Sequence, residues 1–446
     1  MRLPFLITVT LALSACLSPA PAQADRWTPP TLVAPRADVQ FDFAMGADGT
    51  AAAVWERDGI RVVVKRPGHR WSAPRRASDG HHVVGRPAVA VTGRGEVVVA
   101  WTQSATRAAG RPIYGPLTIR SRARGASGRW GTERQLGTTA HFIEAGIDLA
   151  ANERGETIAV WRGVRRLSAR RRADAVQSAF RRPGNAFGGA QAIREPQARR
   201  AGVTGQVVVL DERGTAHAAW SLTVADPVVR LASRSRGARG AWGTPRTIGG
   251  RPSSNPVIAV GADGNVTIAW RAARLNSEGD GIQSGALDVR TRSTSGALTS
   301  TQRVSDAPTS NYRLAAGPLG RAVLAWSGRD SDPPTPGVAD LRVATRATAS
   351  GLFAAPEVVA GVKPADFHGS PVILPDGTVL FAWSDVGRTR VITRPPGGRF
   401  APDAELDVPG LYPLIVAAAD RVVIAWNGVS GDDVALQAAV RYRDAR

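Results

Sequence analysis

Eight copies of one short hydrophobic pattern run through the chain. Each copy places a turn before a run of small and branched apolar residues, and the run ends at a tryptophan. These tryptophans are 43 to 60 residues apart: Trp55, Trp101, Trp161, Trp220, Trp270, Trp326, Trp383 and Trp426. A repeat of about that length built only from strand signals is typical of a radial β-propeller, in which each repeat forms one blade.

Each repeat predicts four antiparallel strands. The first is short and apolar and ends in a turn, as in residues 41–49, and the second is the tryptophan phrase. The third alternates apolar residues with arginine, as in 60–68, and the fourth opens with an aromatic residue, as in 242–249. Asp-Gly and Arg-Gly pairs at the first turn supply the positive φ of a tight hairpin. We therefore predict an all-β, eight-bladed propeller of four-stranded blades, with seven blades as the alternative.

The last repeat ends at Arg446, after its third strand. A segment resembling the missing fourth strand stands at the other end of the chain, where Trp27 opens residues 26–35. We expect residues 27–34 to pair with residues 433–442, which completes the eighth blade and removes an open sheet edge. Residues 25–446 then form one propeller domain, in which all twelve tryptophans pack the blades rather than a ligand.

The N-terminus predicts export. Residues 3–15 form an apolar run behind Arg2 that is too short to span a bilayer and is typical of a secretory signal peptide. Cleavage after Ala24 gives a signal peptide of residues 1–24. Alternatively, residues 13–16 resemble a bacterial lipobox, which gives a signal of residues 1–15 and lipidates Cys16. Either route predicts an extracytoplasmic protein, secreted or lipid-anchored at the cell surface, without an internal disulfide because Cys16 is the only cysteine.

The net charge of +20 is unevenly distributed. Residues 251–446 contain 20 basic and 19 acidic residues, so residues 1–250 hold the remaining 37 basic and 18 acidic ones. The densest stretch is 161–184, where a predicted loop supplies the anion-binding candidates Arg165, Arg166, Arg170, Arg171 and Arg172. This pattern indicates an anionic polymer, a glycan or a protein as partner. The alternative is a generic arginine-rich surface, and the export signal argues against nucleic acid.

Candidate ligand-binding residues collect in the connections between one blade and the next. In this topology these connections share a face with the longer loops at 103–113, 163–173, 272–283 and 328–338. The candidates are His81, His82, His141, Glu144, Tyr312, Asp366, His368 and Tyr412. Histidine can act as a general acid or base and tyrosine can stack on a sugar, although both are also tolerated in loops. No set of catalytic residues is identifiable.

Cofactor signals are weak. His217 stands inside a tryptophan phrase, so we expect it to be buried and hydrogen-bonded rather than a ligand. The pair His81-His82 lacks further metal ligands at a defined spacing. Acidic pairs that could bind calcium, without a known calcium pattern, are Glu278/Asp280, Asp330/Asp332 and Asp432/Asp433. We predict no cofactor and no metal, with calcium as the alternative.

The repeat resembles bacterial secreted β-propeller repeat proteins over nearly the whole mature chain, and the resemblance is one of architecture. The segment Asp48-Gly49-Thr50 followed by Trp55 differs in spacing from the sialidase Asp-box, and the Thr-Gly pair of quinoprotein propellers is missing from the eight phrases. No functional residue is therefore transferred. We expect a monomeric, non-catalytic binding or scaffold protein, and the alternative is a carbohydrate-active enzyme of sialidase-like type.

Overall fold

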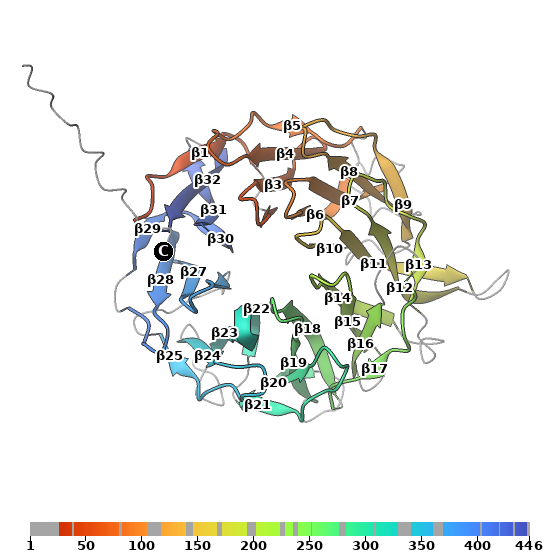
Figure 1. The fold of residues 1–446 in the computed structure, drawn as a ribbon, viewed down its shortest axis with the longest axis vertical. Helices are drawn as coiled ribbons and strands as arrows, with labels where there is room; N and C mark the ends of the chain where they lie inside the picture. Colours follow the sequence, from red (N-terminus) through yellow and green to blue (C-terminus); the bar gives the residue numbers. More distant parts are fainter. Residues whose placement is uncertain are drawn as a thin grey trace, which may run out of the picture.

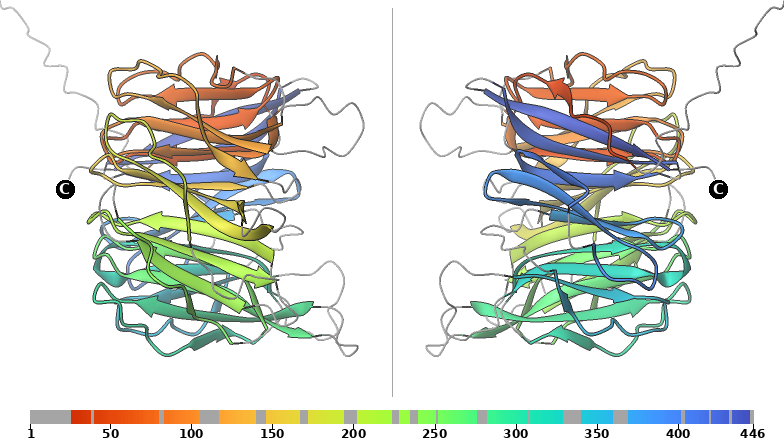
Figure 2. Two further views of the ribbon diagram at one scale, coloured as in Figure 1. Left: turned by 90° about the vertical axis from the view of Figure 1, so that its right-hand side faces the viewer. Right: turned by 90° about the vertical axis from the view of Figure 1, so that its left-hand side faces the viewer.

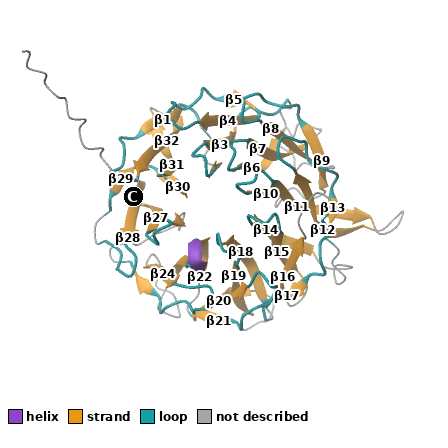
Figure 3. Cartoon of the chain, in the orientation of Figure 1, coloured by secondary structure: helices purple, strands orange, loops and turns teal. Residues whose placement is uncertain are grey.

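The computed structural model describes the chain from residue 26 to residue 443, with internal gaps. The described ranges are 26–37, 40–79, 83–104, 117–139, 146–166, 172–193, 202–223, 228–234, 240–250, 252–275, 282–306, 309–328, 340–359, 369–401, 404–418, 420–430 and 433–443. Their regular structure is 32 strands and one short 3₁₀ turn at Pro318–Gly320 (Figure 1, Figure 3). The strands form eight four-stranded antiparallel sheets arranged in a ring, so the fold is an eight-bladed β-propeller, as predicted.

Each sheet is one blade, and its strands follow one another from the centre of the ring outward. The innermost strands are β2 (Phe41–Met45), β6 (Val83–Val91), β10 (Ile147–Ala151), β14 (Gly202–Leu210), β18 (Ser253–Val260), β22 (Thr309–Ala316), β26 (Gly369–Ile373) and β30 (Leu411–Ala417). The second strands are β3 (Ala51–Glu56), β7 (Val97–Ser104), β11 (Thr157–Arg166), β15 (Ala216–Thr223), β19 (Val266–Leu275), β23 (Ala322–Gly328), β27 (Val379–Asp385) and β31 (Arg421–Ser430).

The outer half of each blade is more polar and ends in a short strand. The third strands are β4 (Ile60–Lys65), β8 (Leu117–Arg124), β12 (Arg172–Arg181), β16 (Val228–Arg234), β20 (Ile282–Arg292), β24 (Asp340–Arg346), β28 (Arg388–Arg394) and β32 (Asp433–Tyr442). The outermost strands are β5 (Arg75–Arg76), β9 (Arg134–Thr139), β13 (Gln191–Ala192), β17 (Arg246–Thr247), β21 (Gln302–Ser305), β25 (Glu357–Val358), β29 (Leu406–Pro409) and, in the last blade, β1 (Thr31–Ala34). Blades are numbered 1 to 8 from β2 onward.

The core lies between the blades. All eight tryptophans of the repeated phrase are at most 2% exposed, and they pack against apolar residues of the adjacent blade. Both faces of a second strand are therefore covered, which explains why the phrase is a continuous apolar run instead of an alternating one. Gly49, with φ of 80°, forms part of the tight turn that leads into the first of these runs.

The two ends of the chain meet in the eighth blade. Strand β1 pairs antiparallel with β32, with Thr31 opposite Ala438, and Trp27 forms a bridge to Arg441 (Figure 1). This is the pairing that the incomplete last repeat predicts. Blade 8 also packs against blade 1, because Phe41 of β2 and Leu436 of β32 belong to one apolar cluster.

Seen from the side, the strands run between two faces of the ring (Figure 2). One face carries the two hairpin turns of each blade, which we call the hairpin face, and the other carries the remaining connections, which we call the loop face. Strands extend farther toward the loop face than predicted: positions 103–104, 163–166, 172–173, 272–275, 282–283 and 328 are in strands, not loops. The ladder continues because each further residue pair adds backbone hydrogen bonds between the two strands. The rest of the four predicted loops lies outside the described residues.

Candidate functional site

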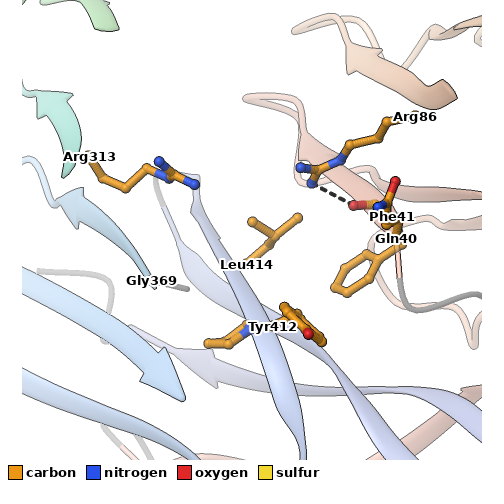
Figure 4. A pocket seen from close by; sticks show the side chains of 8 residues that line it. Gln40, Phe41, Arg86, Arg313, Gly369, Tyr412 and Leu414 are labelled. Carbon is orange, nitrogen blue, oxygen red and sulfur yellow. Dashed lines mark hydrogen bonds between the residues drawn. The ribbon is translucent and has the colours of Figure 1, made fainter. Parts of the chain in front are cut away.

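A pocket of about 340 Å³ opens at the centre of the ring on the loop face. It is lined by residues in, or just before, the first half or so of innermost strands from blades 1, 2, 6, 7 and 8, shown in Figure 4: Gln40, Phe41, Arg86, Arg313, Gly369, Tyr412, Pro413 and Leu414. We call it the central pocket. Residues more than 370 positions apart in the sequence meet here, because the ring brings the starts of the innermost strands together.

Two arginines face each other across the central pocket (Figure 4). Arg86 lies in a bulge of β6, next to Gly85 with its φ of 76°, and Nη2 of Arg86 donates a hydrogen bond of 2.7 Å to the carbonyl oxygen of Phe41. Nη1 of Arg313 donates to the carbonyl oxygen of Tyr312 at 3.0 Å. Both side chains are exposed to solvent within the ring.

The charges of Arg86 and Arg313 are not neutralised by ion pairs. Within the part of the chain that the structure describes, no carboxylate forms a salt bridge with either guanidinium group, and their hydrogen bonds go to neutral carbonyl oxygens. Desolvation by the surrounding protein, and then the charge of Arg86, hold the pKa of Arg313 below its usual range. An anion between the two groups would remove this repulsion.

Arg313 belongs to a layer of side chains that runs once around the innermost strands. A residue of an innermost strand belongs to this layer when it lies opposite the residue that directly precedes the tryptophan of its blade. The members of the layer are Asp42, Ala88, Asp148, Val207, Val257, Arg313, Ser370 and Leu414. Most of these side chains are apolar or small. Only Asp42, Asp148 and Arg313 carry charge at this level, so the repeat departs from its own pattern at three blades.

The two aspartates of this layer bridge neighbouring blades. Oδ2 of Asp42 accepts a hydrogen bond from the backbone N–H of Val89 at 2.8 Å, and Oδ2 of Asp148 accepts one from Val208 at 2.7 Å. Each carboxyl group thereby satisfies an N–H group on the otherwise unpaired inner edge of the next blade. Both aspartates therefore have a structural role.

Burial also changes the acidity of these aspartates. It raises the pKa of Asp148 to about 7, with a smaller contribution from the negative charge of Asp42. Burial likewise raises the pKa of Asp42, while the charge of Arg86 opposes the shift. Near pH 7 Asp148 is therefore partly protonated, which reduces the negative charge on the innermost strands around the central pocket.

At the centre of the ring, the charged side chains that line the pocket on the hairpin face are acidic. A second pocket of about 410 Å³ opens there among backbone turns, alanines and the carboxylates Glu153 and Glu212. The backbone N–H of Glu153 donates to both carboxylate oxygens of Glu212, at 3.0 and 3.2 Å. The two pockets at the centre of the ring therefore differ in their charged lining, with arginines on the loop face and carboxylates on the hairpin face.

The two described tyrosines among the predicted ligand-binding residues have different surroundings. Tyr412 lines the central pocket and is half-buried. Tyr312 is 4% exposed, and its hydroxyl donates to the carbonyl oxygen of Asn255 between two blades, where burial raises the pKa of the phenol. Tyr312 is therefore a packing residue. The other candidates, His81, His82, His141, Glu144, Asp366 and His368, lie outside the described residues.

The predicted anion-binding loop is partly strand. Arg165 and Arg166 belong to β11, and Arg172 belongs to β12, with Arg166 opposite Arg172, whereas Arg170 and Arg171 lie outside the described residues. Placing Arg165, Arg166 and Arg172 in a loop was therefore wrong, because the ladder between β11 and β12 continues past the blade core.

His217 lies where the sequence predicts it. The side chain is 1% exposed, and Nδ1 is 2.9 Å from Oγ of Ser233. Burial, and then the charge of Arg292, lower its pKa to about 3, so this histidine is neutral in the native protein.

The acidic pairs proposed for calcium are mostly outside the described residues, namely Glu278/Asp280, Asp330/Asp332 and Asp432. Asp433 is described, and it begins β32 and forms an ion pair with Arg36 at 2.9 Å. Among the described residues, no group of three or more histidine, cysteine, aspartate or glutamate side chains could hold a metal ion. Cys16 and the predicted signal segment also lie outside these ranges.

Sequence reasoning missed Gln40, Arg86, Asp42, Asp148 and Arg313. A usable signal was present, because Asp42 and Asp148 interrupt apolar strands at the same distance from the tryptophan that follows them. Arg313 interrupts its strand at the equivalent position. Aligning the repeats on their tryptophans and looking for charged residues in the first strand would have found three of the five.

Comparison with known proteins places this chain by its fold. No protein-family profile matches it, and no curated protein matches its sequence. Among solved structures, polysaccharide lyase Uly1 is similar, with a TM-score of 0.51, 8% identity, and 94% of this chain and 100% of that chain covered. The BP39L lectin from Burkholderia pseudomallei gives a TM-score of 0.50, 13% identity, and coverages of 83% and 99%. A PL25 ulvan lyase gives a TM-score of 0.50 and 11% identity, with 93% of this chain and 94% of that chain covered.

These three structures have at most 13% identity to the chain, so the likeness shows a shared propeller fold and nothing finer. In the described ranges, no helix is long and apolar enough to cross a membrane.

Proposed function

We propose that the protein is an extracytoplasmic, non-catalytic binding protein for an acidic glycan, and that the central pocket holds an anionic group of that glycan. One observation carries this proposal. Arg86 and Arg313 point toward each other across the pocket, and among the described residues their hydrogen bonds go to the neutral carbonyl oxygens of Phe41 and Tyr312. Two neighbouring positive groups that form no ion pair with a carboxylate of the described residues favour an anion between them.

The chemistry of the lining supports a carboxylate-bearing or sulfated sugar. Guanidinium groups bind such anions with charge-assisted hydrogen bonds, each stabilising a complex by about 1.5–3 kcal/mol. Gln40 adds an amide, and Tyr412 adds an aromatic ring beside Phe41. A volume of about 340 Å³ is at the small end for ligand pockets, which suits one or two sugar residues better than a segment of folded protein.

The fold comparisons support the same class of ligand. A lectin and two polysaccharide lyases share the propeller architecture of this chain. Their names describe proteins that bind or cleave glycans. They favour a glycan over a small metabolite as the ligand, and the two arginines of the central pocket add the preference for negative charge.

A glycan array tests this proposal. The wild-type protein should bind glycans that end in a uronic or sialic acid in preference to their neutral counterparts. The double variant Arg86→Gln/Arg313→Gln should lose this binding. Arg399→Gln removes an exposed charge from a turn of the hairpin face and should leave binding unchanged. A wild-type preference for neutral glycans, or binding to none of the acidic ones, would contradict the proposal.

A second candidate function is a carbohydrate-active enzyme. The observation that favours it is the pair of carboxyl groups Asp42 and Asp148 on innermost strands, since a carboxyl group with a pKa of about 7 can act as a general acid at neutral pH. Turnover of a chromogenic glycoside or an acidic polysaccharide, lost in Asp148→Asn and falling above pH 7, would establish catalysis. Absence of turnover across such substrates leaves the binding protein as the function.

We also propose export to the cell surface on the basis of the N-terminal signal. The mass of the mature N-terminus separates the two routes. Cleavage after Ala24 yields an unmodified peptide, whereas cleavage before Cys16 yields a lipidated one that Cys16→Ser abolishes.

A further inference from the structure

A strongly basic pocket lies between the outer parts of blades 1 and 2, on the side of the hairpin face. Its volume is about 480 Å³, and it is lined by the third-to-fourth-strand turns of both blades. Four arginines line it, namely Arg66, Arg70, Arg75 and Arg124, and its lining contains no carboxylate. We call it the rim pocket. It is separate from the central pocket, which opens on the loop face.

A missing carboxylate explains why the charge of the rim pocket is not neutralised. At the next junction, Arg181 at the end of β12 forms a buried ion pair of 2.9 Å with Glu96, five residues before the tryptophan of blade 2. Arg124 ends β8 in the same register, but the corresponding residue of blade 1 is Thr50. Nη1 of Arg124 is consequently buried without a hydrogen-bond partner among the described residues.

A second arginine lies close to this unpaired group. A Cβ atom built on Gly128 would lie 2.6 Å from Nη2 of Arg66 and 2.9 Å from Nη2 of Arg124, so the two guanidinium groups converge over this glycine. Burial, and then the charge of Arg66, lower the pKa of Arg124. A bound anion would satisfy the donor and offset the repulsion.

The basic surface continues from the rim pocket into blades 2, 3 and 4. Trp130 also lines an adjacent pocket of about 350 Å³, which contains Arg129 and Arg134. Asn185 and Ala186 in turn connect that pocket to a third one at the junction of blades 3 and 4. The three pockets therefore form a continuous row along the rim of the arginine-rich half of the chain.

We propose that this row binds an extended acidic polysaccharide, with one anionic group held between Arg66 and Arg124 and further groups at Arg129 and Arg134. The site goes beyond the proposed function, because it lies toward the other face of the ring and takes a chain instead of one or two sugar residues. Single-stranded nucleic acid fits less well, since it binds by stacking bases on exposed aromatic rings. The aromatic residues here, Trp130 and Phe187, are half-buried between strands.

Sulfated dextran of defined lengths tests the proposal, with neutral dextran and single-stranded oligothymidylate as comparisons. The variant Arg70→Gln/Arg75→Gln/Arg129→Gln/Arg134→Gln removes four exposed charges from the row. Its matched control, Arg94→Gln/Arg154→Gln/Arg213→Gln/Arg399→Gln, removes four exposed charges from turns of the hairpin face outside these pockets. Arg66→Gln tests the anion position in the rim pocket alone.

The wild type should bind sulfated dextran more tightly as the chain lengthens, and binding should weaken as salt is added. The rim variant should lose about tenfold or more in affinity at low salt, Arg66→Gln should lose part of it, and the control should stay within about twofold. Equal losses in the rim variant and its control would overturn the proposal, as would equally tight binding of oligothymidylate. Binding of acidic glycans in the central pocket should persist in the rim variant, so the two sites can fail independently.

Discussion

At the scale of single residues, His217 shows what the interior of a blade does to a titratable group. It occupies a position that is apolar or threonine in the other seven phrases, and within the described ranges its ring nitrogen forms a hydrogen bond with Ser233. Desolvation, together with the charge of Arg292, keeps it neutral with a pKa of about 3. The unfolded chain has no such constraint, so its histidine titrates with a pKa of about 6.5.

This difference predicts how stability changes with pH. Below about pH 6.5 the unfolded state binds a proton at His217 that the native state does not bind. The contribution of His217 to the free energy of unfolding therefore falls by about 1.4 kcal/mol for each unit by which the pH drops below 6.5. Asp148 acts in the opposite direction, because its native pKa of about 7 lies above that of the unfolded chain and protonation below pH 7 favours the native state.

Comparison of the wild type with His217→Gln isolates the histidine contribution, since Asp148 is common to both proteins. Chemical denaturation at a series of pH values from about 7 to about 4.5 should show the variant gaining stability relative to the wild type by about 1.4 kcal/mol per unit below pH 6.5. Parallel stability curves over this range would mean that His217 is protonated in the native protein or accessible to solvent.

At the scale of strands, the repeated arginines have a structural task that composition alone does not reveal. The third strands of blades 1 to 7 end in a basic residue: Lys65, Arg124, Arg181, Arg234, Arg292, Arg346 and Arg394. Several reach back to the preceding blade. Arg234 lies 4.6 Å from the ring centre of Phe180, and Nη2 of Arg346 donates to Oγ1 of Thr267 at 2.8 Å. Part of the arginine excess therefore connects blades and is not available to a ligand.

The ion pair between Arg181 and Glu96 is a buried link of this kind. The side chains are 3% and 8% exposed, and Glu96 also accepts a hydrogen bond from the N–H of Gly184 at 3.0 Å. Removing one member of a buried pair leaves an uncompensated charge, so Glu96→Gln should lower the free energy of unfolding by about 3 kcal/mol. The double variant Glu96→Gln/Arg181→Met should be less destabilised than the sum of its single variants.

Asp407→Asn provides the comparison for this prediction. It disrupts the ion pairs of Asp407 with Arg388 and Arg390, whose side chains are 42% and 29% exposed against 38% for Asp407, and it should cost less than about 1 kcal/mol. Denaturant titration measures all of these variants. Equal losses for Glu96→Gln and Asp407→Asn, or additive effects in the double variant, would show that the buried pair does not connect the blades energetically.

At the scale of the whole molecule, stability depends on closing the ring with β1. Deleting residues 26–36 removes β1 and exposes the outer edge of β32 to solvent. It also removes the hydrogen bond from the N–H of Thr28 to the carbonyl oxygen of Val440. The deletion should lower the Tm by more than about 5 °C. Leu32→Ser, at a 53% exposed position of β1, should have little effect. An unchanged Tm after the deletion would contradict a closure role for β1.

The features of the whole molecule differ in how far the sequence predicts them. The number of blades, the position of the tryptophans and the pairing of β1 follow from patterns repeated along the chain, and the structure has them. The central pocket was not predictable in this way. Arg86 and Arg313 are 227 positions apart and come from blades that are not neighbours in the ring. Bringing them together requires the geometry of the closed ring.

The candidates chosen from the loops therefore include one residue of the central pocket and one that lies outside it. It selected Tyr412 but also Tyr312, whose side chain turns into the interface between blades. Arg313, the residue next to Tyr312, points into the pocket (Figure 4). Adjacent residues of a strand face opposite sides, so identifying the right neighbour requires the strand register, which a bulge shifts between Thr309 and Tyr312.

The central claim is that Arg86 and Arg313 recognise a negative charge on a sugar. The most direct test is a thermodynamic cycle measured by calorimetry, with an acidic disaccharide and its carboxyl-reduced counterpart titrated into the wild type and into Arg86→Gln/Arg313→Gln. The wild type should prefer the acidic form by at least about tenfold, and the variant should bind both forms equally weakly. A variant that retains the wild-type preference would show that other residues recognise the charge, and the claim would be wrong.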